Sequence, residues 1–235
     1  LHPLRGQNNV QGASDAGLIP MMYPDYNSVE NEEIYSKMEE FWGKKLDKKK
    51  GLTVVEIIDE VINNNIKGMY VMGENPAMSD PDQNHTREGL AKLEHMVVQD
   101  IFMTETAWFA DIILPASAAA EKDGTFTNTN RQVQMGRKAI TPPGEAREDW
   151  RIIIDLANSL GMNWKYQKVS DVFKEMSMVM PSLNNITWER LEKEHSVTYP
   201  CDDINVPGND IIFVEGYPTE DTRGKIVPAQ LVSPA

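Results

Sequence analysis

The fold is decided by the stretch from Lys67 to Gln134, which reads KGMYVMGENPAMSDPDQNHTREGLAKLEHMVVQDIFMTETAWFADIILPASAAAEKDGTFTNTNRQVQ. It contains three short apolar runs, Met69–Met72, Met96–Val98 and Ile112–Leu114, each followed by polar or small residues. Segments of helical length separate these runs. Strands that alternate with helices in this way are typical of a parallel sheet with right-handed crossovers, whose strand ends present polar groups to a ligand. We therefore predict an α/β fold with a Rossmann-like parallel sheet and flanking helices.

Capping signals place the helices around this sheet. Thr53 and Glu56 have the spacing of a capping box and precede an apolar helical face. Asp80 is the expected N-cap of the next helix, because Pro81 follows it at the first helical position. That helix is expected to continue to about Leu93 and to lead into the second strand.

Beyond Pro115 the pattern changes, and residues 116–146 carry few signals of regular structure. The predicted elements that follow are an amphipathic helix at Arg147–Leu160 with Trp150 on its apolar face, helices at 169–179 and 187–194, and a short strand at Ile211–Val214. We therefore predict an α/β domain over residues 1–118, followed by a mixed α+β segment over residues 119–235.

The composition limits the classes of function. The chain of 235 residues has 23 basic and 36 acidic residues, and its net charge of −13 argues against binding to nucleic acid. No apolar run approaches the roughly 18 residues of a membrane span, and no signal peptide is visible, so a cytoplasmic location is expected. The single cysteine, Cys201, can form no internal disulfide. A lysine-rich segment at 44–50 favours a solvated insertion, with a docking patch for another subunit as the alternative.

Polar residues gather where the first two strands end. In the turn GENP, Gly73 allows the backbone to approach a ligand, Asn75 can donate and accept hydrogen bonds, and Ser79 follows at the next helix. Gln99 and Asp100 close the second strand, and a carboxylate there can accept two N–H bonds from guanine. A simple turn and a helix cap are the structural alternatives for these two groups.

Two further positions suit a phosphate-bearing ligand, and a third is an acidic helix start. The hydroxyl of Thr104, like that of Thr106, can cap a short helix or meet a phosphate. Lys122 is a point charge of the kind that neutralises a phosphate, although a single lysine is more often a solvated surface residue. Asp149 opens the amphipathic helix, where its charge also favours the first helical turn.

With the string PLRGQNNVQGASDAG at Pro3–Gly17, this stretch resembles the large subunit of molybdopterin-guanine-dinucleotide oxidoreductases, and formate dehydrogenase alpha subunits in particular. The resemblance is strong over residues 3 to 164 and weak beyond them. It implies that residues 1–118 bind the molybdopterin guanine dinucleotide cofactor. The implied cofactor-binding residues are Gly73, Asn75, Ser79, Gln99, Asp100, Thr104, Lys122 and Asp149.

The resemblance also implies the reaction. Arg5 matches an arginine that lies beside the metal and orients the formate carboxylate, which suits the planar guanidinium, and Gln7 would lie near the cofactor. The complete enzyme would oxidise formate to carbon dioxide at a molybdenum or tungsten centre held by two pterin guanine dinucleotides. Its implied partners are formate, the remainder of the alpha subunit, and iron–sulfur or flavin subunits that carry electrons to NAD or another acceptor.

Several parts of such an enzyme have no match in the chain. None of the four histidines follows a cysteine, as a metal ligand pair would require, and no four-cysteine cluster site or C-terminal cofactor domain is recognisable. We therefore assign no metal ligand and expect a central segment that is inactive alone, with the iron–sulfur cluster in a preceding part of the subunit.

Two alternatives stay open. One is another molybdopterin oxidoreductase, such as a nitrate-reductase-like enzyme, against which the string RGQNNVQGA argues. The other is a noncatalytic fragment that binds a nucleotide weakly or only a partner chain, possessing no cofactor of its own. A nicotinamide-dependent Rossmann enzyme has little support, because no G-x-G-x-x-G motif occurs.

Overall fold

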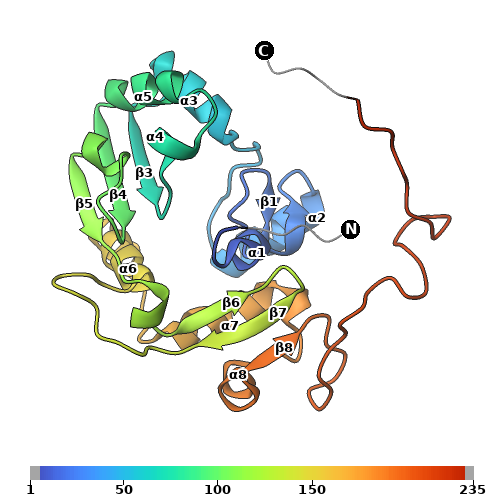
Figure 1. Ribbon diagram of the computed structural model, residues 1–235. Coiled ribbons are helices and arrows are strands. Elements are labelled where there is room, and N and C mark those ends of the chain that lie inside the picture. The colour runs from blue at the N-terminus through green and yellow to red at the C-terminus, as the bar shows by residue number, and fades with distance from the viewer. Residues whose placement is uncertain (1–5, 231–235) are drawn as a thin grey trace.

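The computed structural model describes residues 6–230. Figure 1 shows the elements arranged along a curve, with one three-stranded sheet toward each end and the N-terminal helices on the inner side of the curve. After the last strand, the chain runs on as an extended tail without regular elements.

The first sheet is the predicted parallel sheet. Its strands are β3 (Gly68–Met72), β4 (His95–Asp100) and β5 (Ile112–Pro115). They lie in the order β3-β4-β5, and both neighbouring pairs are parallel, with Val71 opposite Val98 and Val98 opposite Ile113. Helices α4 (Pro76–Ser79) and α5 (Gln83–Lys92) connect β3 to β4, and a 3₁₀ turn, η2 (Ala107–Phe109), precedes β5. The α/β class is therefore confirmed.

Helix α3 (Val54–Ile62) and helix α5 cover one face of this sheet. The apolar core between them contains Ile58 of α3, Leu90 of α5 and the strand residues Val71, Met96 and Val98. All five are buried, and the three strand residues share one face because alternate residues of a strand point to the same side of a sheet. The packing fixes the strand ends, where the predicted ligand-binding residues lie.

The predicted start of α3 is correct, whereas that of α5 is not. The capping box of α3 is confirmed, since the backbone N–H and the hydroxyl of Thr53 both donate to Glu56 Oε2 at 2.7 Å. The prediction that Asp80 caps the next helix is wrong. Helix α5 begins two residues later than expected, and Asp82 caps it by accepting the N–H of His85 at 3.2 Å. Asp80 instead ends α4.

The second sheet is antiparallel and was not predicted. Its strands are β6 (Gly124–Thr127), β7 (Gln132–Gly136) and β8 (Ser196–Thr198), in the order β6-β7-β8. The other elements of this half are η3 (Ala119–Glu121), α6 (Asp149–Ser159), α7 (Val169–Val179), η4 (Pro181–Leu183) and α8 (Trp188–Glu194). The three predicted helices are confirmed within a few residues. The strand predicted at Ile211–Val214 is wrong, because this segment bends, the backbone of Phe213 is left-handed with φ at +59°, and Ile211 is 75% exposed.

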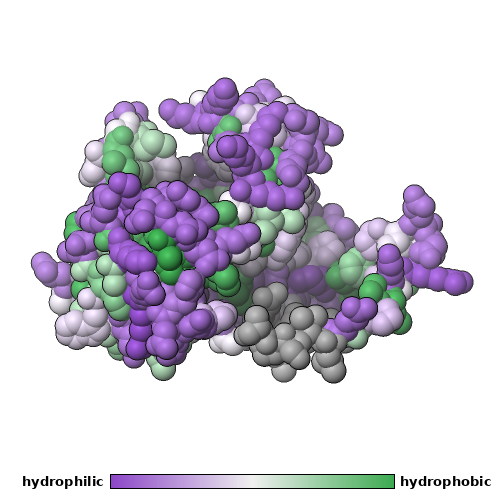
Figure 2. All heavy atoms as spheres, turned by 90° about the horizontal axis from the view of Figure 1, so that it is seen from above, coloured by the Kyte–Doolittle hydropathy of each residue, from purple (hydrophilic) through white to green (hydrophobic). Residues whose placement is uncertain are grey.

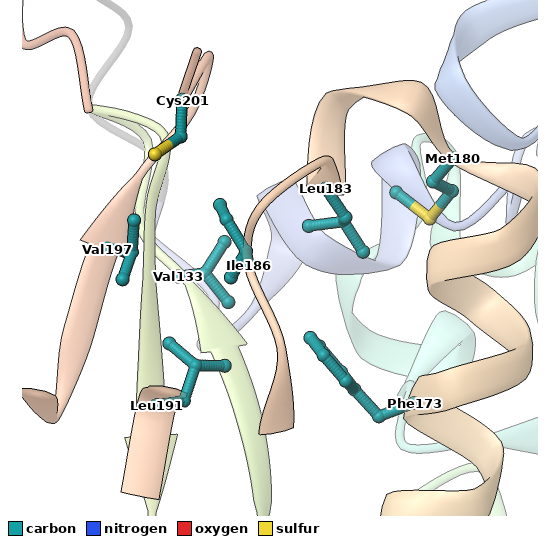
Figure 3. Packing of buried hydrophobic residues seen from close by; sticks show 8 residues of the cluster. All are labelled: Val133, Phe173, Met180, Leu183, Ile186, Leu191, Val197 and Cys201. Carbon is teal, nitrogen blue, oxygen red and sulfur yellow. The ribbon is translucent and has the colours of Figure 1, made fainter. Parts of the chain in front are cut away.

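A compact apolar core joins the second sheet to its helices. Figure 3 shows its residues converging from β7, α7, α8 and β8 and the segments next to them. They are Val133, Phe173, Met180, Leu183, Ile186, Leu191, Val197 and Cys201. The aromatic ring of Phe173 meets Trp188 edge to face, with ring centroids 5.9 Å apart. Cys201 is buried here as part of the packing.

The N-terminal elements pack against this second half. They are α1 (Val10–Asp15), β1 (Met22–Tyr23), η1 (Pro24–Tyr26), β2 (Asn27–Ser28) and α2 (Glu32–Trp42). The buried carboxylate of Asp15 accepts the hydroxyl of Tyr199 at 2.8 Å, and Asp25 accepts the backbone N–H of Ser182 at 2.8 Å. Contacts thus cross the boundary expected at residue 118, and that boundary stays a prediction.

The outer surface agrees with the acidic composition. Figure 2 shows hydrophilic side chains over much of one face, with hydrophobic side chains in smaller areas between them. Within residues 6–230, none of the helices combines the length and the apolar character that a membrane crossing requires.

Candidate functional site

A cavity of about 550 Å³ lies where the two halves of the chain meet, and it is the candidate site. Its polar end is lined by Gly73, Ser117, Lys122, Asp149 and Trp150, which come from the end of β3, the segment after β5, and the start of α6. Its apolar end is lined by side chains that include Phe126, Phe173, Met176 and Trp188. The fold thus brings Gly73 and Trp150, which are 77 positions apart in the sequence, to the same cavity.

Gly73 is the first residue after β3 and faces this cavity. Its backbone is left-handed, with φ at +65°, a conformation that favours glycine. Its N–H donates to the carbonyl of Gln99 at 2.9 Å, which ties the turn to β4. A Cβ added here would meet no atom within 4 Å, so the space next to the backbone is open to a ligand.

Lys122 and Asp149 form an ion pair at the polar end. Their side chains are 23% and 28% exposed, so the pair is partly shielded from solvent. Lys122 Nζ also donates to the carbonyl of Ser117 at 2.8 Å. Asp149 is the first residue of α6, where its charge is favourable for the helix dipole. Both residues predicted to hold the cofactor therefore lie together in the cavity wall.

Gln99 positions Asp149 from the other side. The Gln99 amide donates from Nε2 to Asp149 Oδ1 at 2.8 Å, and its Oε1 accepts the hydroxyl of Tyr70. Burial raises the pKa of Tyr70, and the negative charge of Asp149 raises it further. Tyr70 therefore stays a hydrogen-bond donor at neutral pH and keeps the Gln99 amide turned toward Asp149. Gln99 is fully buried, so its predicted contact with a cofactor stays a prediction.

Asp100 ends β4 with one carboxylate oxygen engaged. Its Oδ1 accepts the backbone N–H of Ile101 at 2.6 Å and of Phe102 at 3.2 Å. Within residues 6–230, its Oδ2 accepts no hydrogen bond, so this oxygen can accept one from a ligand. Ile101, the next residue, lines the cavity.

Asn75 holds two loops together. Its Oδ1 accepts the backbone N–H of Thr106 at 3.1 Å and the Thr106 hydroxyl at 2.8 Å, and its Nδ2 donates to Glu105 at 2.7 Å. Thr106 is fully buried and in turn accepts the N–H of Ala77 at 3.0 Å. The two strand ends are thus locked to each other by side chains.

The other two predicted hydroxyl groups also make local bonds. Ser79 Oγ donates to the carbonyl of Asn75 at 3.1 Å, and Thr104 Oγ1 accepts the N–H of Ala107 at 3.2 Å. The capping role expected of Thr104 is therefore present. Asn75, Ser79 and Thr104 do not line the cavity, and their contacts with a cofactor stay predictions.

We expect Asn75→Ala to lower the free energy of unfolding by about 1–2 kcal/mol, because it leaves buried polar atoms of Thr106 without partners. Ser79→Ala, which removes only an exposed local bond, is the matched control and should change stability by less than about 0.5 kcal/mol. Urea unfolding followed by circular dichroism measures both. Equal stabilities for the two variants would show that the Asn75 bridge does not hold the loops.

The N-terminal string reaches the same region. Gln7 Nε2 donates to Glu74 Oε1 at 3.4 Å, which brings the loop before α1 next to the turn after β3. Gln7 borders a smaller cavity of about 100 Å³ that is also lined by Asn9 and Thr127. Arg5, the predicted substrate-binding residue, lies outside the described residues.

Two residues of the site were missed by the sequence reasoning. Ser117 is fully buried and its Oγ has no hydrogen-bond partner among residues 6–230. Trp150 Nε1 is likewise buried without a partner in this part of the chain. Ser117 lies in a run of small residues that resembles a loop, and Trp150 matches the apolar face of α6, so neither position signals a polar role in the sequence.

No metal centre is formed by the described side chains. Nowhere in residues 6–230 do three or more His, Cys, Asp or Glu residues gather in a way that could hold a metal ion.

Comparisons with known proteins complete the description of the site. The family model described as molybdopterin oxidoreductase matches residues 5–159. The F420-dependent formate dehydrogenase subunit alpha of Methanocaldococcus jannaschii is 50% identical over 232 residues, which are 98% of this chain and 34% of that protein. The probable oxidoreductase YjgC of Bacillus subtilis is 41% identical over 235 residues, which are 99% of this chain and 24% of that protein. The chain thus spans about a third and about a quarter of these relatives.

A solved structure is similar in fold. Acetylene hydratase from Pelobacter acetylenicus matches with a TM-score of 0.52 and 20% sequence identity. The match covers 70% of this chain and 24% of that one. At this level of identity the likeness concerns the fold alone.

Proposed function

The chain belongs to the molybdopterin oxidoreductase family, and we propose that it forms the central segment of the catalytic subunit of a formate dehydrogenase. The observation that carries this proposal is its 50% identity, along nearly its whole length, to a protein named as a formate dehydrogenase alpha subunit. In the complete subunit, formate would be oxidised to carbon dioxide. The contact between Gln7 and Glu74 supports the proposal, because it brings Gln7, which follows Arg5 by two positions in the sequence, next to the turn after β3.

The side chains at the polar end of the cavity fit a phosphate-bearing cofactor. Lys122 supplies a positive charge, and the open backbone at Gly73 permits a close approach. The ammonium of Lys122 suits acceptor oxygens, as expected for the dinucleotide part of a molybdopterin guanine dinucleotide.

Each residue then has a physical task. Lys122 would balance the charge of a phosphate, and Asp149 would keep Lys122 at the cavity wall until the ligand binds. Gln99 holds Asp149 in place. Asp100 would accept an N–H of the guanine base through its remaining oxygen, and Arg5 would orient formate through two parallel hydrogen bonds to its carboxylate. When bound, the cofactor with its molybdenum or tungsten supplies the two-electron redox chemistry.

We propose that turnover needs the remainder of the subunit, since residues 6–230 provide no group of side chains that could hold a metal ion. An iron–sulfur cluster in another part of the subunit, and iron–sulfur or flavin partner subunits, would carry the electrons away. A cytoplasmic location is part of the same proposal and stays a prediction.

Asp100→Ala in the complete subunit is expected to lower the cofactor content about 10-fold, because a charge-assisted hydrogen bond to the guanine base is lost. Asp100→Asn keeps an acceptor for the N–H groups of Ile101 and Phe102 but loses the charge, so it separates the loss of the ligand from a local change of the loop. The exposed Asp155→Ala is the control. Pterin fluorescence after oxidation, together with metal analysis, measures the content. Full occupancy in both Asp100 variants would remove Asp100 from the site.

A further inference from the structure

Helix α1 is short and forms part of the cavity wall, where it lies against β6 (Figure 1). It directly follows residues 6–9, the loop that comes next to Arg5 in the sequence. A helix of six residues has little stability by itself in water. The position of α1, and with it the position of this loop, is therefore set by contacts with other elements.

The start of α1 is fastened to β6. Its N-cap residue Asn9 has a left-handed backbone with φ at +58°, and Asn9 Oδ1 accepts the backbone N–H of Thr127 at 2.9 Å. Gly12 makes room for this side chain, because a Cβ added at Gly12 would overlap with Asn9 Oδ1. The string NNVQG thus combines a side chain that reaches β6 with the glycine that lets it pass.

The end of α1 is fastened to a residue 184 positions away. Asp15, the last residue of α1, is 4% exposed, and its two carboxylate oxygens accept Gln11 Nε2 at 2.7 Å and the Tyr199 hydroxyl at 2.8 Å. The backbone N–H of Tyr199 donates to the carbonyl of Arg131 at 3.1 Å, and the Arg131 guanidinium donates back to the carbonyl of Tyr199. Burial raises the pKa of Tyr199, and the hydrogen bond to Asp15 raises it further, so the hydroxyl stays a donor at neutral pH.

The bond between Asp15 and Tyr199, called here the Asp15–Tyr199 lock, favours one arrangement more than it favours stability. Burying a carboxylate is costly even when it is hydrogen-bonded, so an apolar contact of the same size would stabilise the fold at least as well. Hydrogen bonds instead fix direction, and bonds at both ends hold α1 against turning about its axis and against sliding along β6. The loop before α1 then meets the turn after β3, where Gln7 donates to Glu74 at 3.4 Å.

We propose that Asp15 and Tyr199 are positioning residues for the oxidation of formate. The lock fixes α1, and α1 fixes the loop next to Arg5, while neither residue contacts the substrate. The inference rests on the proposed function, in which Arg5 orients formate. Tyr199 lies beyond residues 5–159, which the family model matches, so the lock connects a later part of the chain to this loop.

In the complete, cofactor-loaded subunit, Tyr199→Phe should lower kcat/KM for formate about 10-fold at unchanged pterin and metal content, because a loosened loop holds Arg5 in the productive position less often. Tyr166→Phe is the matched control and should leave kcat/KM unchanged. Tyr166 also donates its hydroxyl to a carboxylate, that of Glu175, but it does not line the cavity. Asp15→Asn, which keeps an acceptor for Tyr199, should retain more activity than Asp15→Ala. Equal kcat/KM in Tyr199→Phe and Tyr166→Phe would overturn the proposal.

Combination with Arg5→Lys separates a positioning role from a general structural one. If the lock acts through Arg5, the effect of Tyr199→Phe on kcat/KM should shrink to less than about 3-fold in the Arg5→Lys background, because the effects of coupled residues do not add. A loss of the same size in both backgrounds would show that Tyr199 does not act through Arg5.

Backbone hydrogen exchange, followed by mass spectrometry of the complete subunit, tests the lock without reference to the reaction. Tyr199→Phe should speed exchange at residues 13–18 about 10-fold, whereas Tyr166→Phe should not. If exchange speeds up but the unaltered subunit does not oxidise formate, the proposed reaction is wrong and the lock stands. If the unaltered subunit oxidises formate and Tyr199→Phe changes neither exchange nor kcat/KM, the lock is wrong and the proposed function stands.

Discussion

Lys122→Met in the complete subunit is expected to weaken the binding of the pterin dinucleotide cofactor about 100-fold, or roughly 2.7 kcal/mol. Among the described residues that line the cavity, Lys122 is the only lysine or arginine. Methionine keeps much of the length of the side chain but removes the charge that would balance a phosphate. The substitution also leaves the partly buried carboxylate of Asp149 unpaired, and its charge then repels the anionic cofactor.

Cofactor retention during dialysis, followed by metal and pterin analysis, measures this effect. Lys92→Met, on the surface of α5, is the matched control and should keep the full content. In the double variant Lys122→Met with Asp149→Asn, the unpaired charge is removed, so part of the lost affinity should return. If Lys122→Met retains the cofactor as well as the unaltered enzyme does, the cavity is not the dinucleotide site.

Arg5→Lys is expected to lower kcat/KM for formate about 100-fold while the cofactor content stays unchanged. Lysine keeps the positive charge but loses the planar pair of donors that matches a carboxylate, so formate would be held without a fixed orientation. The hydrogen bond between Gln7 and Glu74 supports this role, because it places the loop two residues beyond Arg5 at the strand ends.

The comparison is made by steady-state kinetics with a redox dye as electron acceptor. Arg137→Lys, at an exposed arginine that donates to the carbonyl of Glu192, is the control for a general effect of the exchange. Unchanged kcat/KM in Arg5→Lys would remove Arg5 from the substrate site. A loss of cofactor along with activity would instead assign Arg5 to cofactor binding.

The parallel sheet could be predicted from the sequence because its signals are local. The apolar runs of β3, β4 and β5 are each flanked by polar residues, and the capping box at Thr53 fixes the helix before them. The hairpin of β6 and β7 could not be predicted, because its strands GTFT and QVQMG are mostly polar. In addition, β7 pairs with β8, which lies about 60 residues later in the sequence. The start of α5 was misplaced because two aspartates compete for one cap.

The residues of the candidate site likewise divide into those with a signal in the sequence and those recognisable only in the folded chain. Lys122 and Asp149 were found by their charge and by the family resemblance, and the structure shows that they pair. The role of Gln99 as a positioning residue depends on Tyr70 and Asp149, which lie 29 and 50 residues away, and no local pattern reveals it. Ser117 and Trp150 stand out only in the folded chain, because the absence of a partner is a property of the surroundings and not of the residue.

Formate-dependent dye reduction by the complete, cofactor-loaded subunit tests the central claim most directly. The account predicts that formate is oxidised to carbon dioxide and that nitrate is not reduced under the same conditions. A subunit that is fully loaded with molybdopterin cofactor, yet reduces nitrate or another substrate and leaves formate untouched, would contradict it.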